Sequence, residues 1–178
     1  YNSYLQQLST GFGQGISVTA FQMVQAFTAI ANQGEMKKLR IVDHEFRPAT
    51  NTTVNFSENS LGQVIKPETA KKTLEYLRKA TTMKDGTAID FDIEGEEVAA
   101  KTGTAELVNP ETGTYYSYGS NYIYSVVGFA PASDPKYILY ITLKQPQNNP
   151  YGAGGSALIK EIFNPMMKRA LDYSRLTQ

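Results

Sequence analysis

The chain has 178 residues, enough for one domain or a large part of one. Hydrophobic residues make up 41%, which favours a packed core and excludes a disordered chain. The 17 Lys and Arg residues balance 17 Asp and Glu residues, which argues against a nucleic-acid-binding protein, because such proteins need excess cations to neutralise phosphates. The absence of cysteine excludes disulfides, thiolate zinc sites and a cysteine nucleophile.

Targeting signals are absent from the sequence. It holds no run of about 18 apolar residues that could span a membrane, and no signal-peptide pattern opens it. Because the first residue is Tyr1 rather than a methionine, we expect the chain to begin inside a longer protein.

The first predicted helix follows a glycine-rich turn at residues 11–15. Thr19 and Gln22 have capping-box spacing, so Thr19 is the expected N-cap. Apolar residues then recur at helical spacing, and Gly34 is the expected C-terminal stop. This helix is amphipathic and must be covered by another part of the fold.

Weak periodicity marks residues 35–65, where we expect a short strand at 39–42 and a polar loop at 50–60. A second helix is expected from Pro67, a favourable first helical residue. Its apolar face comprises Ala70, Leu74 and Leu77.

Three strands are predicted next, at residues 97–104, 121–129 and 137–143. The last two are joined by the tight connection 131–136 and should pair as an antiparallel hairpin. The third run is rich in β-branched and aromatic residues, which predicts burial on both faces.

A final helix is predicted after the glycine pair at 154–155, with Ser156 as its cap and a kink at Pro165. Its expected inward residues are Leu158, Ile162, Phe163, Met166 and Ala170. Helices followed by an antiparallel hairpin and a closing helix indicate an α+β fold with sheet strands flanked by helices.

The tripeptide Lys-Thr-Gly at 101–103, at the end of a predicted strand, is one of three signatures of serine acyl transferases that react with penicillin. By chance, a chain of this composition would contain roughly 0.1 copies. The tripeptide alone leaves open an ordinary strand that ends in a turn.

The wider sequence resembles the class B penicillin-binding proteins, in particular the division-specific monofunctional enzymes of Gram-positive bacteria. The resemblance covers nearly the whole chain, with four matches in the family's order. They are Gly-Phe-Gly-Gln-Gly-Ile-Ser-Val-Thr at 11–19 with the helix through residue 32, Gly-Thr-Ala at 86–88, Ser-Val-Val-Gly-Phe-Ala-Pro at 125–131, and Asp-Pro-Lys-Tyr at 134–137.

The resemblance implies that residues 1–178 are the C-terminal part of a single penicillin-recognising, β-lactamase-like transpeptidase domain. The parent protein would cross-link peptidoglycan stem peptides ending in D-Ala-D-Ala through a serine acyl-enzyme, without metal or cofactor. β-Lactams would acylate the same serine. The parent would act at the extracytoplasmic face of the cell membrane, held by an upstream anchor, with divisome proteins among its partners.

The resemblance also implies roles for the Lys-Thr-Gly strand, whose edge would accept an extended peptide as an added strand. Lys101 supplies positive charge near the substrate carboxylate, and the hydroxyls of Thr102 and Thr104 can bind that carboxylate. Gly103 allows close approach of the substrate and of a neighbouring helix. The backbone N–H of Thr104 would be half of an oxyanion hole, and Glu106 is a weaker candidate beside it.

The family's other motifs, Ser-x-x-Lys and Ser-x-Asn, are expected upstream of Tyr1, so we assign no nucleophile in this chain. Matches do occur at residues 133–136 and 57–59, but chance alone supplies roughly 0.7 and 0.6 copies. A nucleophilic serine and its lysine belong one turn apart on a helix. We interpret both matches as surface turns.

Three other features carry less weight. The glycine-rich stretch 11–15 lacks the last glycine of a dinucleotide fingerprint and is read as a turn. His44, the only histidine, is expected to be exposed. The tyrosines at 115, 116 and 118 follow the Lys-Thr-Gly strand, and packing is favoured there over a role beside the substrate groove.

Two alternative functions remain open from the sequence. A serine β-lactamase or β-lactam sensor shares Lys-Thr-Gly, although the match around residues 11–32 favours a transpeptidase. A non-catalytic, partner-binding fragment is the other alternative. Such a fragment would expose core faces and should associate or be marginally stable.

Overall fold

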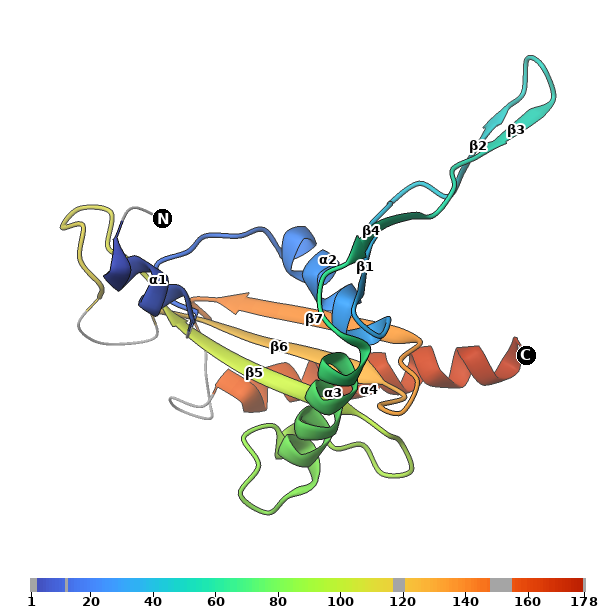
Figure 1. The fold of residues 1–178 in the computed structure, drawn as a ribbon. Helices are drawn as coiled ribbons and strands as arrows, with labels where there is room; N and C mark the ends of the chain where they lie inside the picture. Colours follow the sequence, from blue (N-terminus) through green and yellow to red (C-terminus); the bar gives the residue numbers. More distant parts are fainter. Residues whose placement is uncertain (1–2, 12, 117–120, 148–154, 178) are drawn as a thin grey trace.

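The computed structural model describes residues 3–11, 13–116, 121–147 and 155–177. A three-stranded sheet lies at the centre, helices cover both of its faces, and a long two-stranded arm projects from one side (Figure 1). The elements are α1 (Tyr4–Gly11), α2 (Ala20–Ala31), β1 (Glu35–Lys38), β2 (His44–Arg47), β3 (Thr52–Asn55), β4 (Asn59–Gln63), α3 (Pro67–Thr82), the 3₁₀ helix η1 (Ile89–Phe91), β5 (Ala99–Glu106), β6 (Tyr122–Ala130), β7 (Tyr137–Lys144) and α4 (Gly155–Leu176).

The central sheet has the order β5-β6-β7, and both strand pairs are antiparallel. The predicted hairpin between the last two strands is therefore confirmed, as is the α+β class. The strand predicted at residues 97–104 begins and ends two residues later, at Ala99 and Glu106. The burial predicted for both faces of β7 is wrong, because its residues are only half-buried or exposed in this structure.

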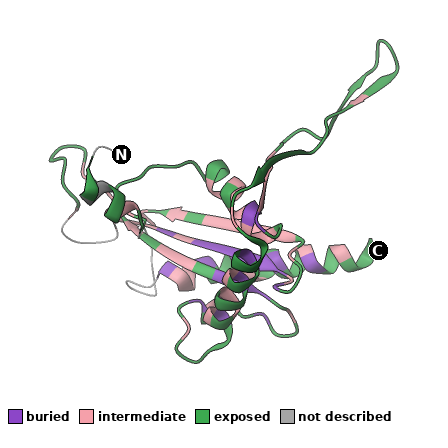
Figure 2. Ribbon diagram, in the orientation of Figure 1, coloured by how far each residue is buried: buried purple, intermediate pink, exposed green. Residues whose placement is uncertain are grey.

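Alternation along the strands divides the core between the two sheet faces. One face packs on α4, where Val126 and Phe163 are fully buried and Phe163 meets Phe91 edge-to-face. The opposite face packs on α2 and α3, where Phe129 meets Phe27 from α2 and Ala99 contacts the cluster around Leu74. Figure 2 shows the buried residues gathered along these strands and the helices beside them.

Helix α2 has the predicted start and a tighter end than predicted. Thr19 and Gln22 form the complete capping box. At the other end, the N–H of Gly34 donates to the carbonyl of Ala29 at 2.7 Å, which confirms Gly34 as the stop. Gln33 precedes it with a positive φ of 52°, so two successive left-handed residues turn the chain into β1.

Helix α3 also starts as predicted, with Pro67 in its first turn. Ala70 and Leu74 are buried, and Leu77 is partly buried against the same cluster.

Helix α4 has the predicted period but a different buried face. The residues it buries are Gly155, Ile159, Phe163, Met167 and Leu171. Of the predicted inward set only Phe163 is among them, whereas Ile162 is 41% exposed and Met166 is 51% exposed. Ser156 lies inside α4, so its role as the cap is wrong, and the helix continues through Pro165.

The arm comprises residues 35–63 and is the region where the sequence predictions fail. Residues 39–42 are not a strand, and the expected loop at 50–60 contains β3 and the start of β4. β1 pairs with β4 and β2 pairs with β3, both antiparallel. Nearly all residues of the arm are exposed (Figure 2). None of the helices in the described ranges is long and apolar enough to cross a bilayer.

Candidate active site

The predicted site residues all lie on β5, which is an edge strand. One side of β5 pairs with β6 from Ala99 to Glu106, and no other described strand pairs with the opposite side. This unpaired side of β5 is called the free edge below. Figure 1 shows it at the margin of the central sheet.

The register determines which main-chain groups point to the free edge. The N–H of Leu107 donates to the carbonyl of Asn121 at 3.1 Å, so this pair is hydrogen-bonded. Hydrogen-bonded pairs alternate with non-hydrogen-bonded pairs in an antiparallel ladder. The N–H and C=O groups of Thr102 and Thr104 therefore point away from β6.

A side-chain contact agrees with this assignment. The Lys101 ammonium donates to the carbonyl of Thr102 at 2.6 Å, on the side that β6 does not occupy. The Ser125 hydroxyl, from β6, lies 3.5 Å from the carbonyl of Gly103, on the paired side. The free edge thus presents the main chain of residues 102 and 104 to an incoming strand.

The side chains of the predicted site divide between the two sheet faces. Lys101 lies opposite Val127, on the face that packs on α2 and α3. Thr102 and Thr104 lie opposite Val126 and Tyr124, on the face that packs on α4. Glu106 shares this second face by alternation. The free edge, rather than one face, brings these residues together.

Gly103 has a close neighbour, although not the one expected. A Cβ at this position would lie 2.6 Å from the Ser125 hydroxyl oxygen. The expected neighbour was a helix, and the structure places a β6 side chain there instead. A larger residue at 103 would require the Ser125 hydroxyl to rotate away from β5.

The Gly-Thr-Ala turn at 86–88 lies against the same strand. The Thr102 hydroxyl donates to the carbonyl of Thr87 at 3.5 Å. Ala88 is fully buried in the α4-side core, and Gly86 packs on the carbonyl of Ala80 too closely for a Cβ. Two stretches that resemble the family separately are therefore in contact, which spacing along the chain could not reveal.

The charges of the site are open to solvent. Lys101 and Glu106 are exposed, and within the described residues neither takes part in an ion pair. No group of three or more His, Asp or Glu residues in the described ranges could hold a metal ion. The site offers one cation, hydroxyls and main-chain groups, which suit an anionic or peptide ligand.

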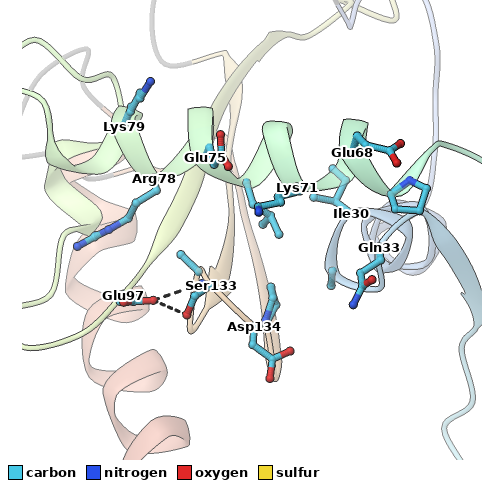
Figure 3. A pocket seen from close by; sticks show the side chains of 15 residues that line it. Ile30, Gln33, Glu68, Lys71, Glu75, Arg78, Lys79, Glu97, Ser133 and Asp134 are labelled. Carbon is cyan, nitrogen blue, oxygen red and sulfur yellow. Dashed lines mark hydrogen bonds between the residues drawn. The ribbon is translucent and has the colours of Figure 1, made fainter.

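The two chance motifs lie far from this arrangement. The Ser133 hydroxyl donates to the Glu97 carboxylate at 2.6 Å (Figure 3). Lys136 pairs with Asp134 at 2.6 Å. Ser133 lies in the β6–β7 turn, as predicted, and not on a helix. Residues 57–59 are exposed on the arm, where His44 is exposed as well.

A groove of about 990 Å³ does not coincide with the predicted site. It lies between α3, the end of α2 and the β6–β7 turn (Figure 3), and none of residues 101–106 lines it. We place the candidate chemistry on β5 instead, because the Lys-Thr-Gly motif and the main-chain groups of the free edge lie there and not in the groove.

The loop after β5 continues as a short hairpin. Val108 bridges Tyr115, and the Tyr115 hydroxyl donates to the Gln14 side chain at 3.4 Å. Tyr115 is nevertheless 45% exposed, so packing is not confirmed for it, and Tyr118 lies outside the described residues. Gly13 and Gly15 have positive φ, as the turn prediction required, but α1 precedes them and was not predicted.

Comparison with known proteins shows the family of this chain. The family model "Penicillin binding protein transpeptidase domain" matches residues 1–168. The chain belongs to this family. It is 35% identical over 167 residues to penicillin-binding protein PbpB of Mycolicibacterium smegmatis, covering 88% of this chain and 25% of that protein. It is 37% identical over 144 residues to stage V sporulation protein D of Bacillus subtilis, covering 80% and 21%.

Solved structures show the same fold. Penicillin-binding protein 2X from Streptococcus thermophilus superposes with a TM-score of 0.87 at 27% identity, covering 97% of this chain and 26% of that one. The chain therefore spans about a quarter of the length of the relatives it matches. The expected fold, the penicillin-recognising transpeptidase domain, is confirmed.

Proposed function

We propose that this chain is the C-terminal part of the transpeptidase domain of a peptidoglycan D,D-transpeptidase. The observation that carries the proposal is the free edge of β5, where the main chain of Thr102 and Thr104 is available beside the Lys101 ammonium. Curated relatives with the same family domain include one named peptidoglycan D,D-transpeptidase FtsI, from Escherichia coli.

In the proposed mechanism a stem peptide ending in D-Ala-D-Ala binds along β5 as an added antiparallel strand. Its terminal carboxylate accepts hydrogen bonds from the hydroxyls of Thr102 and Thr104 and is attracted by Lys101. Gly103 keeps β5 close to β6, and Glu106 borders the bound peptide two residues further along. For the peptide to approach, the Lys101 ammonium must release the carbonyl of Thr102.

The acyl-transfer step needs groups from both parts of the domain. A serine upstream of this chain attacks the carbonyl of the penultimate D-Ala, and the terminal D-Ala leaves as the amine. The N–H of Thr104 stabilises the developing oxyanion, a contribution typically worth about 3–4 kcal/mol. An acceptor amine from a second stem peptide then attacks the acyl-enzyme, which forms the cross-link and frees the serine. A β-lactam acylates the same serine.

The cellular setting follows from the same proposal. The parent protein acts outside the cytoplasmic membrane, with its anchor outside this chain and with divisome proteins as partners. It needs neither metal nor cofactor. The upstream part of the same protein is the first partner, because it supplies the nucleophile.

Covalent labelling with a fluorescent penicillin tests the proposal. The chain is compared alone and joined to its upstream segment, with the upstream serine changed to alanine as the control. We expect labelling only when the upstream segment with its serine is present. Labelling of the chain alone would refute the assignment of the nucleophile, and Ser133 would be examined first. No labelling of the folded, complete domain would refute the proposed function.

A further inference from the structure

An edge strand that binds a peptide has a mechanical problem. Its free edge must stay open for the substrate, and among the described strands β5 has a neighbour on one side only. Strands at sheet edges are the parts of a sheet that open most readily. Oxyanion donors act only when they are held in place before the reaction. The rigidity of β5 must therefore come partly from its ends.

The N-terminal end of β5 is held by the β6–β7 turn. The carbonyl of Glu97 accepts from the N–H of Ala132 at 2.7 Å. The Glu97 carboxylate accepts from Ser133 twice, from its hydroxyl at 2.6 Å and from its N–H at 3.3 Å. Figure 3 shows Glu97 facing Ser133 across the space below α3. Two consecutive turn residues, Ala132 and Ser133, thus donate hydrogen bonds to Glu97, which lies two positions before β5.

The next residue is held from the opposite side, by α3. The carbonyl of Val98 accepts from the Arg78 guanidinium at 3.0 Å, and the hydroxyl of the fully buried Thr81 lies 2.8 Å from it. Arg78 is itself fixed by Asp92 at 2.8 Å. Residues 97 and 98 are therefore clamped between a turn and a helix immediately before Ala99.

We propose that Glu97 and Ser133 are positioning residues for the active-site strand, because their hydrogen bonds fix the start of β5 against the β6–β7 turn and keep the main chain of residues 102–104 aligned at the free edge. The inference rests on the proposed function. It assigns a role to the serine of the chance Ser-x-x-Lys match, which is conformational and not nucleophilic. The same hydrogen bonds lower the pKa of Glu97, so the carboxylate is ionised at neutral pH and accepts strongly.

The test uses the complete domain with its upstream segment and three variants of the turn. Ser133→Ala removes the hydroxyl that binds Glu97. Ser133→Thr keeps a hydroxyl and is the rescue variant. Asp134→Asn is the matched control, because Asp134 lies in the same turn but pairs with Lys136 and does not contact β5.

Two readouts are measured for each variant. The first is the rate of acylation by a fluorescent penicillin, separated into the rate at saturation and the half-saturating concentration. For Ser133→Ala we expect the saturating rate to fall about tenfold with the half-saturating concentration within about twofold, because misplacing a reacting group costs more in the transition state than in binding. The second is amide hydrogen exchange over residues 97–106, which should accelerate in Ser133→Ala. Ser133→Thr and Asp134→Asn should match the wild type in both.

Defined results would overturn the inference. A saturating rate for Ser133→Ala within about twofold of the wild type would leave the hydrogen bonds merely structural, whatever the exchange shows. Equal losses in Ser133→Ala and Asp134→Asn would mean that any change in the turn has the same effect. If the wild type is not acylated, the proposed function fails, and unchanged exchange in Ser133→Ala would then refute the positioning of β5 separately. Glu97→Gln, which keeps an acceptor but loses the charge, should give an intermediate rate and serves as the second variant.

Discussion

The central sheet and the arm are both antiparallel β structure, yet they differ in what surrounds them. Strands β5, β6 and β7 lie between α4 on one face and α2 and α3 on the other. Strands β2 and β3 form a two-stranded sheet that no other element covers in the described structure. The central sheet with α2, α3 and α4 is called the body below. The body is stabilised by apolar burial, whereas the arm is stabilised mainly by its own main-chain hydrogen bonds.

This difference explains which region the sequence revealed. Burial selects apolar and β-branched residues, so β6 and β7 are recognisable as strands. The arm strand β2 reads His-Glu-Phe-Arg and β4 reads Asn-Ser-Leu-Gly-Gln, and every residue of both strands is exposed. Without a buried face there is no alternation to detect, and a polar strand resembles a loop.

The largest expected effect lies in the body, at the packing of α4. Phe163 is fully buried against Phe91 and Gly128. We expect Phe163→Ala to lower the free energy of unfolding by about 3–5 kcal/mol, measured by urea denaturation of the complete domain. Ile162→Ala is the matched control, expected to change it by about 0.5 kcal/mol or less. A larger loss for Ile162 would mean that the predicted face of α4 was right and the observed one wrong.

A smaller effect is expected where the arm joins the body. Thr28 in α2 is buried, and its hydroxyl accepts from the N–H of Lys37 in β1 at 2.8 Å. Thr28→Val keeps the shape of the side chain but leaves that N–H unpaired. This should lower the free energy of unfolding by about 1–3 kcal/mol. Amide hydrogen exchange at Lys37 should accelerate in Thr28→Val. Thr50 is exposed, so Thr50→Val should change neither the free energy of unfolding nor the exchange at Lys37. Unchanged exchange at Lys37 would show that the arm does not depend on this bond.

On the arm itself a large side chain should matter little. Phe46 is 55% exposed, and its cross-strand neighbour is Thr53. We expect Phe46→Ser to change the free energy of unfolding by less than about 0.5 kcal/mol in urea denaturation. A loss approaching that of Phe163→Ala would contradict the contrast between arm and body, and would reveal a contact made by the rest of the protein.

The last comparison concerns pH. Hydrogen bonds from Ser133 hold the pKa of Glu97 below its ordinary value of 4.5. A carboxyl group with a depressed folded-state pKa stabilises the fold above its unfolded value, and this stabilisation is lost as pH falls through the folded value. The difference in melting temperature between wild type and Glu97→Gln should therefore be present at neutral pH and shrink below pH 4.5. If the difference in melting temperature does not vary with pH, the charge of Glu97 does not contribute to the stability of the fold.

Several local features were predictable because they depend on neighbours in the chain. The capping box of Thr19, the start of α3 at Pro67 and the β6–β7 hairpin each follow from residues a few positions apart. The Lys-Thr-Gly motif was likewise found in a strand, as predicted. The hydrogen bond from Ser133 to Glu97 was not predictable, because 36 positions separate the two residues.

By itself the sequence determined the family and the periods of most of its helices and strands, and it located the Lys-Thr-Gly motif on a strand. It did not determine the phase of α4, because Ile162 and Phe163 belong to two apolar sets with the same helical period. Only packing on the sheet selects one set, since burying Ile159, Phe163 and Met167 places the Phe163 ring against Gly128. The sequence also left open which side of β5 is free. The tertiary structure decided this, because pairing with β6 uses one set of main-chain groups and leaves those of Thr102 and Thr104 pointing to the free edge.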